Sequence, residues 1–374
     1  MGANPLLGVL YHWIGGLASA SNFIPFRPIR RWSWEICWIV QGFGAWIVAP
    51  LLIGFLCVPE LMTILRQAPP ATLWHTFVWG ALWGVGGLTF GLAIRYLGIA
   101  LGYAIALGFC TAFGTLMPPL FNRQIGTIVH QRGGQVILAG IALCLVAIAV
   151  NGMAGRLKEK EVLGRAMTAA GERDYSFGKG LAVAIFAGIM SSCFAYGLAA
   201  GKPIAALAKD HLAAGHRALL WQNLPVLVVV LWGGFLTNFV WSVVLILRNR
   251  SAQQFLGAPG INPLSTAIEE DEDASIRLSP RVLLRNYVLA ALAGLLWYFQ
   301  FFFYSMGETK MGKYDFSSWT LHMASIIIFA TLWGIALREW RATSGKTRLL
   351  VACGLCLLVG STVVVGYGNY LTAH

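Results

Sequence analysis

The amino-acid sequence predicts an all-α, polytopic membrane protein with ten transmembrane helices. Hydrophobic residues make up 57% of its 374 positions, charged residues only 11%, and the mean hydropathy is +0.69. A soluble domain of this size needs a far more charged surface. The apolar residues also fall into runs of about 20, the length at which a helix crosses a bilayer.

The ten expected spans follow one another along the whole chain. The first has neither a basic leader nor an Ala-x-Ala cleavage site, so we expect a retained helix and not a signal peptide. Trp32, Trp34 and neighbouring arginines form a belt at the start of the second span. Glycines four apart in the third and fourth, such as Gly80 and Gly84, favour close helix packing. The seventh is long enough to bend near Pro225. The spans cover residues 5–24, 35–57, 72–94, 98–120, 134–154, 178–200, 218–247, 282–306, 316–337 and 348–371.

The distribution of positive charge predicts how the chain sits in the membrane. The first, third, fifth, seventh and ninth connections, with their flanks, hold 19 of the 27 Lys and Arg residues, and the other connections hold 8. By the positive-inside rule the first set is cytoplasmic, which places both termini on the opposite side. No dense basic run with interleaved aromatic residues occurs. The net charge of +12 therefore does not indicate nucleic-acid binding, and we expect a lipid bilayer as the partner of this protein.

Only one connection, at about 248–281, is both long and polar. It carries five consecutive acidic residues, Glu269 to Asp273, and is expected to be a solvated linker. The other connections are too short for a soluble catalytic domain. The chain also lacks a nucleotide-binding P-loop, a nucleophile elbow and metal-ligand spacing. These observations speak against an enzyme, against ATP hydrolysis and against a bound metal, and they leave gradient-driven transport.

Short matches between the two halves indicate an internal repeat. Gly16–Ala20 in the first span resembles Gly188–Ser192 in the sixth, and Gly140–Leu145 in the fifth resembles Gly354–Leu358 in the tenth. Both pairs lie five helices apart, and duplication of an odd number of spans inverts the second copy, with the ligand between the halves. The expected units are 1–154 (first five-helix repeat), 155–177 (cytoplasmic connection) and 178–374 (second five-helix repeat).

The most informative run is Gly294–Met323, which reads as the end of the eighth span, a polar turn and the start of the ninth. Gln300 sits among aromatic residues. Asp315 and His322 share a face if one helix holds both, because seven residues make about two turns. A bilayer offers no water to such groups, so each needs a partner or a ligand. Aromatic faces beside an amide, an imidazole and a carboxylate suit a polyhydroxylated ligand, and the alternative is that the polar groups only link helices.

Other polar residues in or beside the spans widen the candidate set. They include His12, Gln41 and the acids Glu35 and Glu308. An ionisable group is costly to keep in a membrane. Histidine exchanges protons near neutral pH, and burial moves a carboxyl group toward the same range. Glu35 also has an alternative interpretation as an interfacial residue, because it follows the basic and aromatic belt.

Several long motifs of unusual composition run through the chain. They include Trp83–Gly86, Trp297–Tyr304, Tyr314-Asp315, Ser318–Met323 and Leu337–Trp340. Together they resemble the L-rhamnose–proton symporter family of the drug/metabolite transporter superfamily, over the whole length of the chain. The resemblance implies two inverted five-helix halves, a bacterial inner membrane with periplasmic termini, and proton-coupled sugar import.

The expected activity is import of L-rhamnose, or a related 6-deoxyhexose, by alternating access, with the proton as coupling ion and no other cofactor. Gly87 stands where the family tends to have Asn, which leaves the exact sugar open. The alternatives are export or exchange of another small metabolite, a non-transporting sensor, and a channel. The expected sugar-binding residues are Gln300, Tyr304, Trp319, His322, His12 and Gln41, and the expected proton-coupling residues are Asp315, His322 and Glu35.

Overall fold

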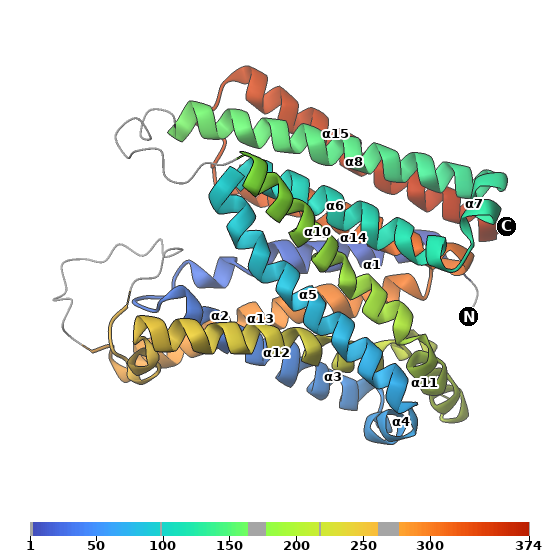
Figure 1. Ribbon diagram of the computed structural model, residues 1–374, viewed down its shortest axis with the longest axis horizontal. Coiled ribbons are helices and arrows are strands. Elements are labelled where there is room, and N and C mark those ends of the chain that lie inside the picture. Colours follow the sequence, from blue (N-terminus) through green and yellow to red (C-terminus); the bar gives the residue numbers. More distant parts are fainter. Residues whose placement is uncertain (1–2, 98, 164–176, 217, 261–276, 374) are drawn as a thin grey trace.

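Long helices form the body of the molecule (Figure 1). The computed structural model describes residues 3–97, 99–163, 177–216, 218–260 and 277–373, and all regular secondary structure within these ranges is helical. The long helices are α1 (Pro5–Ser21), α2 (Trp34–Gly42) with α3 (Ala49–Cys57), α5 (Pro70–Leu97), α6 (Ile99–Phe121), α8 (Arg132–Lys158), α10 (Phe177–Ala200), α12 (Leu224–Asn249), α13 (Pro280–Glu308), α14 (Ser318–Ala336) and α15 (Gly345–Ala373). The short helices are α4 (Leu61–Gln67), α7 (Ile125–His130) and α11 (Lys202–Ala214).

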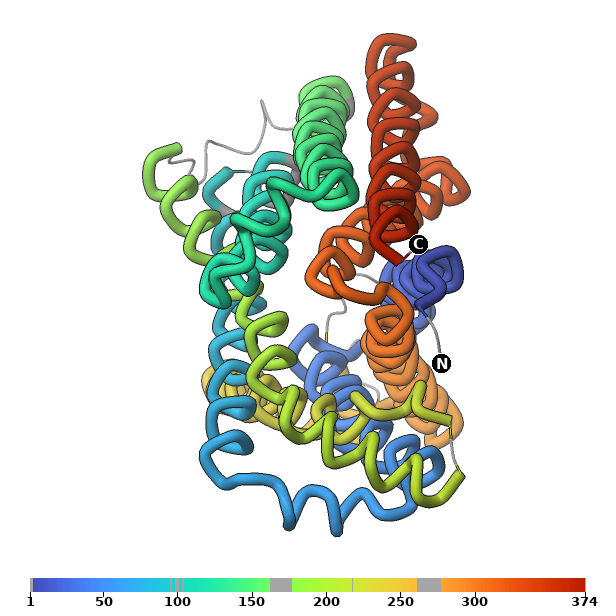
Figure 2. Tube along the Cα trace, turned by 90° about the vertical axis from the view of Figure 1, so that its right-hand side faces the viewer, coloured from blue at the N-terminus to red at the C-terminus, as the bar shows by residue number. Residues whose placement is uncertain are grey.

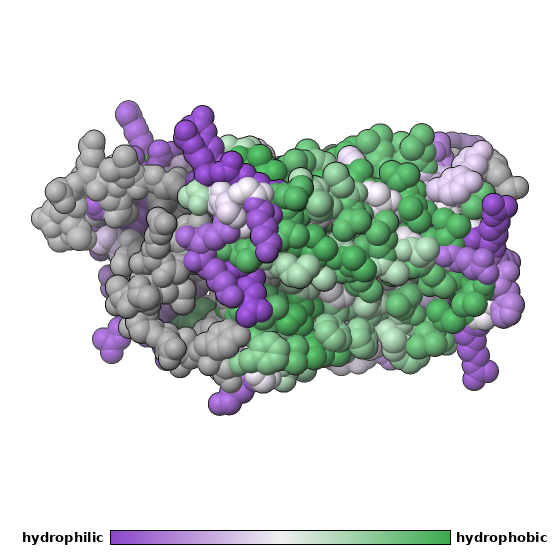
Figure 3. All heavy atoms as spheres, turned by 90° about the horizontal axis from the view of Figure 1, so that it is seen from above, coloured by the Kyte–Doolittle hydropathy of each residue, from purple (hydrophilic) through white to green (hydrophobic). Residues whose placement is uncertain are grey.

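The outer surface has an apolar band between two polar ends. Figure 3 shows hydrophobic side chains over the middle of the molecule and hydrophilic side chains gathered toward its ends. Among the described residues, nine helices are long and apolar enough to cross a membrane. The protein is therefore a multi-pass membrane protein. Helix α1 has 17 residues, which is at the short limit for a crossing helix.

The two ends of the molecule differ in what they carry. Both chain termini and the short helices α4, α7 and α11 lie at one end (Figure 1). The last turns of α8 and α12 lie at the other. Of the polar loop expected at 248–281, the structure describes a 3-10 turn at Ala252–Leu256. The acidic run Glu269 to Asp273 lies outside the described residues.

Helices occur where the apolar runs predict them, with corrections to two spans. The second span is not one regular helix, because a π-helical segment at Phe43–Val48 separates α2 from α3. In the fifth span, helical structure continues past residue 154 through Lys158 and then as a π-helical segment to Leu163. Helical structure therefore continues into the expected connection at 155–177, whose bounds remain a prediction.

Side-chain caps and prolines explain where two helices begin. The side chain of Asn4 accepts a hydrogen bond from the backbone N–H of Leu7, the third residue of α1, at 3.1 Å, and Pro5 is the first helical residue. Ser279 caps α13 in the same way at 3.4 Å, followed by Pro280. A proline fits the first helical position because its missing N–H has no helical partner there.

Glycines let α1 lie very close to α13 and α14. A Cβ atom on Gly15 would lie 2.8 Å from the carbonyl oxygen of Gln300, and one on Gly16 would overlap Ser325 of α14. A Cβ atom on Gly307 of α13 would lie 3.0 Å from the carbonyl oxygen of Gly8. Such approaches bring helix backbones into direct contact. Figure 2 shows α1 in blue beside the orange segments of α13 and α14, so its side chains project between them.

Candidate functional site

Four aromatic side chains from three helices meet in the interior. His12 comes from α1, Tyr304 from α13, and Trp319 and His322 from α14. The ring centroid of Tyr304 lies 5.3 Å from that of His12, 5.2 Å from His322 and 5.8 Å from Trp319. Each of the four residues is at most 3% exposed. The structure thus brings together four residues that the sequence singled out, and we call them the central cluster.

The two imidazoles of the central cluster are buried without partners. Neither ring nitrogen of His12 or His322 has a hydrogen-bond partner within the described part of the chain, and both residues are 0% exposed. Buried polar groups in proteins are nearly always hydrogen-bonded, and a bilayer offers no water in compensation. The ring centroids lie 6.4 Å apart, so one small ligand can reach both. This arrangement indicates a site for ligand hydroxyl groups.

Trp319 offers an apolar face and not a free donor. Its indole N–H donates to the carbonyl oxygen of Cys110 on α6 at 3.0 Å, and Gly114, one turn further on, leaves room for the ring. The ring stacks on Phe194 of α10 at 5.8 Å, and Phe194 stacks on Phe301 of α13 at 4.3 Å. The indole is therefore held in one orientation, where its face can cover the C–H groups of a ligand.

One candidate glutamine, Gln300, belongs to α13, and the other, Gln41 of α2, packs against that helix. Gln300 lies one turn before Tyr304 on the same helix face, and it is 4% exposed. Its amide nitrogen has no hydrogen-bond partner among the described residues, and neither has either amide atom of Gln41 on α2. The backbone of Gln41 packs against Gly294 of α13, so Gln41 lies further from Tyr304 along this helix than Gln300 does.

An aromatic layer that the sequence analysis did not single out adjoins the central cluster. The ring centroid of Trp83 on α5 lies 5.5 Å from that of Phe301 and 6.3 Å from that of Trp46. Trp46 belongs to the π-helical segment. The indole N–H groups of Trp46 and Trp297 have no acceptor within the described ranges. Trp83 and Trp297 each begin one of the motifs noted in the sequence. Their helices, α5 and α13, are far apart in the chain, so the spacing of residues does not predict that they meet.

The structure contradicts the prediction that Asp315 and His322 share a helix face. Asp315 lies in a turn, Gly312–Ser317, in which Tyr314 leaves helical geometry at φ −108° and ψ 51°. Gly312 has a φ of +75°, which favours glycine and turns the chain before α14. Asp315 instead forms an ion pair with Lys202 of α11 at 3.0 Å, and its side chain is 35% exposed.

Glu35 lies far from this ion pair. Its carboxylate accepts hydrogen bonds from Asn249 at 3.0 Å and from a serine two residues further on at 2.8 Å. Asn249 ends α12, whereas Asn223 precedes that helix and donates to Glu308, near Asp315. Helix α12 has 26 residues, which span about 39 Å. Glu35 and Asp315 therefore belong to opposite ends of the molecule.

A charged pocket of about 340 Å³ opens at the end of α13, beside α11 and α12. Burial opposes the positive charge of Lys202, but the negative charges of Asp315 and Glu308 outweigh it and raise the pKa of this lysine. The lining residues are Leu198, Lys202, Ala205, Ala206, Lys209, Gln222, Asn223, Val226, Glu308, Thr309, Gly312 and Asp315. We call this cavity the charged pocket.

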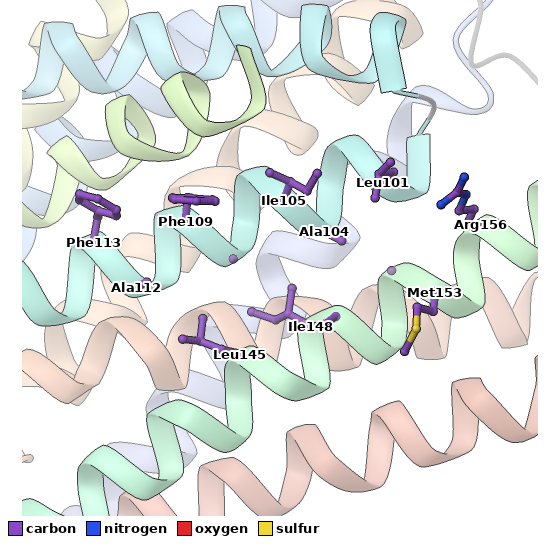
Figure 4. A pocket seen from close by; sticks show the side chains of 13 residues that line it. Leu101, Ala104, Ile105, Phe109, Ala112, Phe113, Leu145, Ile148, Met153 and Arg156 are labelled. Atoms are coloured by element: carbon purple, nitrogen blue, oxygen red, sulfur yellow. The ribbon is translucent and has the colours of Figure 1, made fainter. Parts of the chain in front are cut away.

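A groove of about 500 Å³ between α6 and α8 has a different character (Figure 4). Figure 4 shows Leu145 and Ile148 of α8 facing α6, and Arg156 at one end. All other side chains that line the groove are apolar. A sugar site needs several convergent polar groups, which this groove does not offer. The central cluster is the better candidate for the ligand site.

The fold defines a multi-pass membrane protein, and its helices enclose a polar and aromatic cluster that is a candidate ligand site. A family model described as the L-rhamnose-proton symport protein matches residues 1–370. The chain is 32% identical over 365 residues to the L-rhamnose-proton symporter of Cronobacter sakazakii and 31% identical over 363 residues to that of Klebsiella pneumoniae (strain 342). Each match covers 97% of both chains. The chain belongs to the L-rhamnose-proton symport protein family, which confirms the resemblance seen in its motifs.

Proposed function

We propose that this protein imports L-rhamnose, or a related 6-deoxyhexose, together with protons by alternating access. Its relatives carry the name L-rhamnose-proton symporter along 97% of both chains. In the structure, the supporting observation is the pair of buried, unpartnered imidazoles of His12 and His322 beside aromatic faces. The proposal requires no catalytic residue and no cofactor besides the coupling proton.

The central cluster supplies complementary groups for a deoxyhexose. The imidazoles of His12 and His322, the hydroxyl of Tyr304 and the amide of Gln300 bond the sugar hydroxyls. The indole face of Trp319 covers the apolar side of the ring, where a 6-deoxy sugar also carries a methyl group. Gln41 of α2, whose backbone packs against Gly294 of α13, is a weaker member of this set.

Contacts between α8 and α15 support an inverted repeat. Gly140 of α8 packs against Val365 of α15, and Gly354 of α15 packs against Asn151 of α8. Positions 354 and 365 each lie 214 residues after positions 140 and 151. Exchanging the two helices therefore reproduces the same two contacts, as expected for halves related by a two-fold axis in the membrane plane.

Helices α1 and α10 occupy equivalent places under this relation. Gly16 of α1 packs on α14, and Gly188 of α10 packs on α6. Helix α1 also packs against α13, as α10 does against α5, so the first helix of each half inserts into the other half. We propose ten membrane spans, α1 included, in two inverted repeats at 1–154 and 178–374, joined by a cytoplasmic connection within 155–177.

The end that carries both termini faces the periplasm of a bacterial inner membrane in this proposal. Figure 1 shows the two termini at the same end, as an even number of spans requires. The connections at the opposite end, among them 155–177 and 248–281, hold more of the lysines and arginines. The charged pocket lies at the end of the termini, and it then opens toward the periplasm.

The proton needs a group that each side of the membrane reaches in turn. Asp315, His322 and Glu35 remain candidates on polarity alone. Asp315 lines the charged pocket, His322 belongs to the central cluster, and Glu35 lies at the opposite end of α12. Their order along the molecule is compatible with a path for the proton across the membrane.

The external pH of de-energised, lightly buffered cells that express the protein tests the proposal. Addition of L-rhamnose should raise the external pH, because sugar and proton enter together, whereas L-fucose and glucose should not. Uptake of labelled L-rhamnose without a pH change would remove the proton from the proposal. Cells that take up no L-rhamnose, with the protein present in the membrane, would refute the proposed substrate.

A further inference from the structure

The charged pocket holds two carboxyl groups but only one close ion pair. Lys202 pairs with Asp315 at 3.0 Å, and no second ion pair involves a lining residue in the described part of the chain. The other carboxyl belongs to Glu308, whose Oε2 atom accepts a hydrogen bond from the side-chain amide of Asn223 at 2.9 Å. Because Asn223 is neutral, no cation among the described residues forms an ion pair that balances a charge on Glu308.

The two acids differ in what compensates a negative charge on each of them. Asp315 has an ammonium in contact, and its side chain is 35% exposed. Glu308 is half-buried and ends α13, where the helix dipole disfavours negative charge. Two carboxyl groups beside one ammonium also repel each other, so one of them tends to keep a proton. The charged and titratable groups around Glu308 are Lys202, Lys209, Asp315, Tyr304 and His12.

Glu308 also adjoins the central cluster. It follows Tyr304 by one helical turn on the same face of α13. It directly follows Gly307, against which the imidazole of His12 packs. The unpartnered ring nitrogens of His12 and His322 are an independent sign that a ligand binds next to this carboxyl group. Glu308 thus lines the charged pocket and also adjoins the place where the sugar is proposed to bind.

We propose that Glu308 carries the coupled proton, an assignment that rests on the proposed symport of a deoxyhexose. When the charged pocket is open, a proton from the outer solution forms an O–H bond on a carboxylate oxygen of Glu308. The neutral side chain no longer repels Asp315, and the end of α13 can close over the bound sugar with less charge to bury. When the site opens to the other side, the O–H bond breaks and the proton leaves to the inner solution with the sugar.

Glu308→Gln separates proton coupling from sugar binding. Glutamine keeps the size of the side chain and an oxygen that accepts the hydrogen bond of Asn223, but it cannot take up a proton. Proteoliposomes preloaded with L-rhamnose should still exchange it for labelled L-rhamnose. Accumulation of L-rhamnose driven by an imposed proton gradient should fall to the level of empty liposomes. The matched control is Glu60→Gln, at a 61% exposed side chain outside the pocket, and it should retain both activities.

The possible outcomes distinguish a failure of the Glu308 assignment from a failure of the proposed transport function. Gradient-driven accumulation of L-rhamnose by Glu308→Gln would overturn the assignment. If Asp315→Asn loses this accumulation while Glu308→Gln retains it, Asp315 carries the proton instead. Absence of L-rhamnose exchange in the unaltered protein would instead refute the proposed function. If Glu308→Gln does not reach the membrane, Glu308→Asp keeps a titratable group, and it should accumulate L-rhamnose with a shifted pH profile. An unshifted profile in this variant would overturn the assignment as well.

Discussion

Replacement of Gly307 by alanine should displace His12 from the central cluster. A Cβ atom at this position would lie 2.8 Å from both Cε1 and Nε2 of His12, and 3.0 Å from the carbonyl oxygen of Gly8. Ordinary van der Waals contact begins at 3.4 Å, so the overlap with the imidazole is about 0.6 Å. The backbone of α1 is fixed by its own hydrogen bonds, so the imidazole is the group that moves.

The expected loss of affinity is that of one hydrogen bond. A neutral hydrogen bond contributes about 0.5–1.5 kcal/mol. At about 1.4 kcal/mol for each factor of ten, losing the bond between His12 and the sugar raises the Kd for L-rhamnose about 2- to 12-fold. If α1 and α13 move apart instead, the overpacking costs about 1–3 kcal/mol of stability, which lowers the Tm.

Titration of purified protein with L-rhamnose, by calorimetry or tryptophan fluorescence, measures this effect. The control is Gly126→Ala, because no heavy atom lies within 4 Å of a Cβ at Gly126, and its Kd should match that of the unaltered protein. His12→Ala should raise the Kd at least as much as Gly307→Ala does. Unaltered affinity in both Gly307→Ala and His12→Ala would refute the placement of His12 at the sugar.

Three further substitutions test separate parts of the site. His322→Ala should abolish saturable L-rhamnose uptake at unchanged membrane expression, and uptake with ordinary kinetics would contradict the proposed site. Gly87→Asn introduces the amide expected from the family resemblance, one turn after Trp83. One added hydrogen bond should lower the Kd for L-rhamnose about 2- to 12-fold. Competition with unlabelled sugars measures this change in affinity. Glu35→Gln weakens the hydrogen bonds from Asn249 and its neighbouring serine, and thermal unfolding should show a loss of about 1 kcal/mol; an unchanged Tm would argue against a structural role.

The sequence predicts the members of the site better than their contacts. Gln300 and Tyr304 are four residues apart on an apolar helix, so their common face follows from helical period alone. The meeting of His12 with His322 does not follow from any local pattern. It depends on how closely α1 approaches its neighbours, which is set by glycines such as Gly16 and Gly307 on different helices.

The incorrect prediction for Asp315 has a local cause. A seven-residue spacing to His322 gives a shared face only if the helix already exists at Asp315. Gly312, with its φ of +75°, and the non-helical Tyr314 place Asp315 in a turn before α14. Glu308 was recognised as a candidate buried acid from the sequence, but its neutral partner Asn223 is distant in the chain, and only the fold brings the two together.

Within the described residues, the proposed inverted repeat carries buried histidines on only one of its two equivalent sides. The central cluster lies where α1 packs against α13 and α14, and the corresponding region lies where α10 packs against α5 and α6. The alignment that pairs Gly16 with Gly188 pairs His12 with Ala184. Around Ala184, hydrophobic residues form a cluster whose buried members are at most 4% exposed. Its buried members are Ala93, Leu97, Ala106, Ala184 and Ala187.

This asymmetry predicts which contacts change during transport. Dry, closely packed side chains move as a block, because separating them loses contacts that nothing replaces. The contacts around His12 differ, since a sugar can bond polar atoms that the protein leaves unpartnered. Hydrogen exchange followed by mass spectrometry should therefore show L-rhamnose slowing exchange in peptides of α1 much more than in peptides of α10. Equal slowing in both helices would mean that the two sides open together, and it would contradict the idea that only one of them holds the ligand.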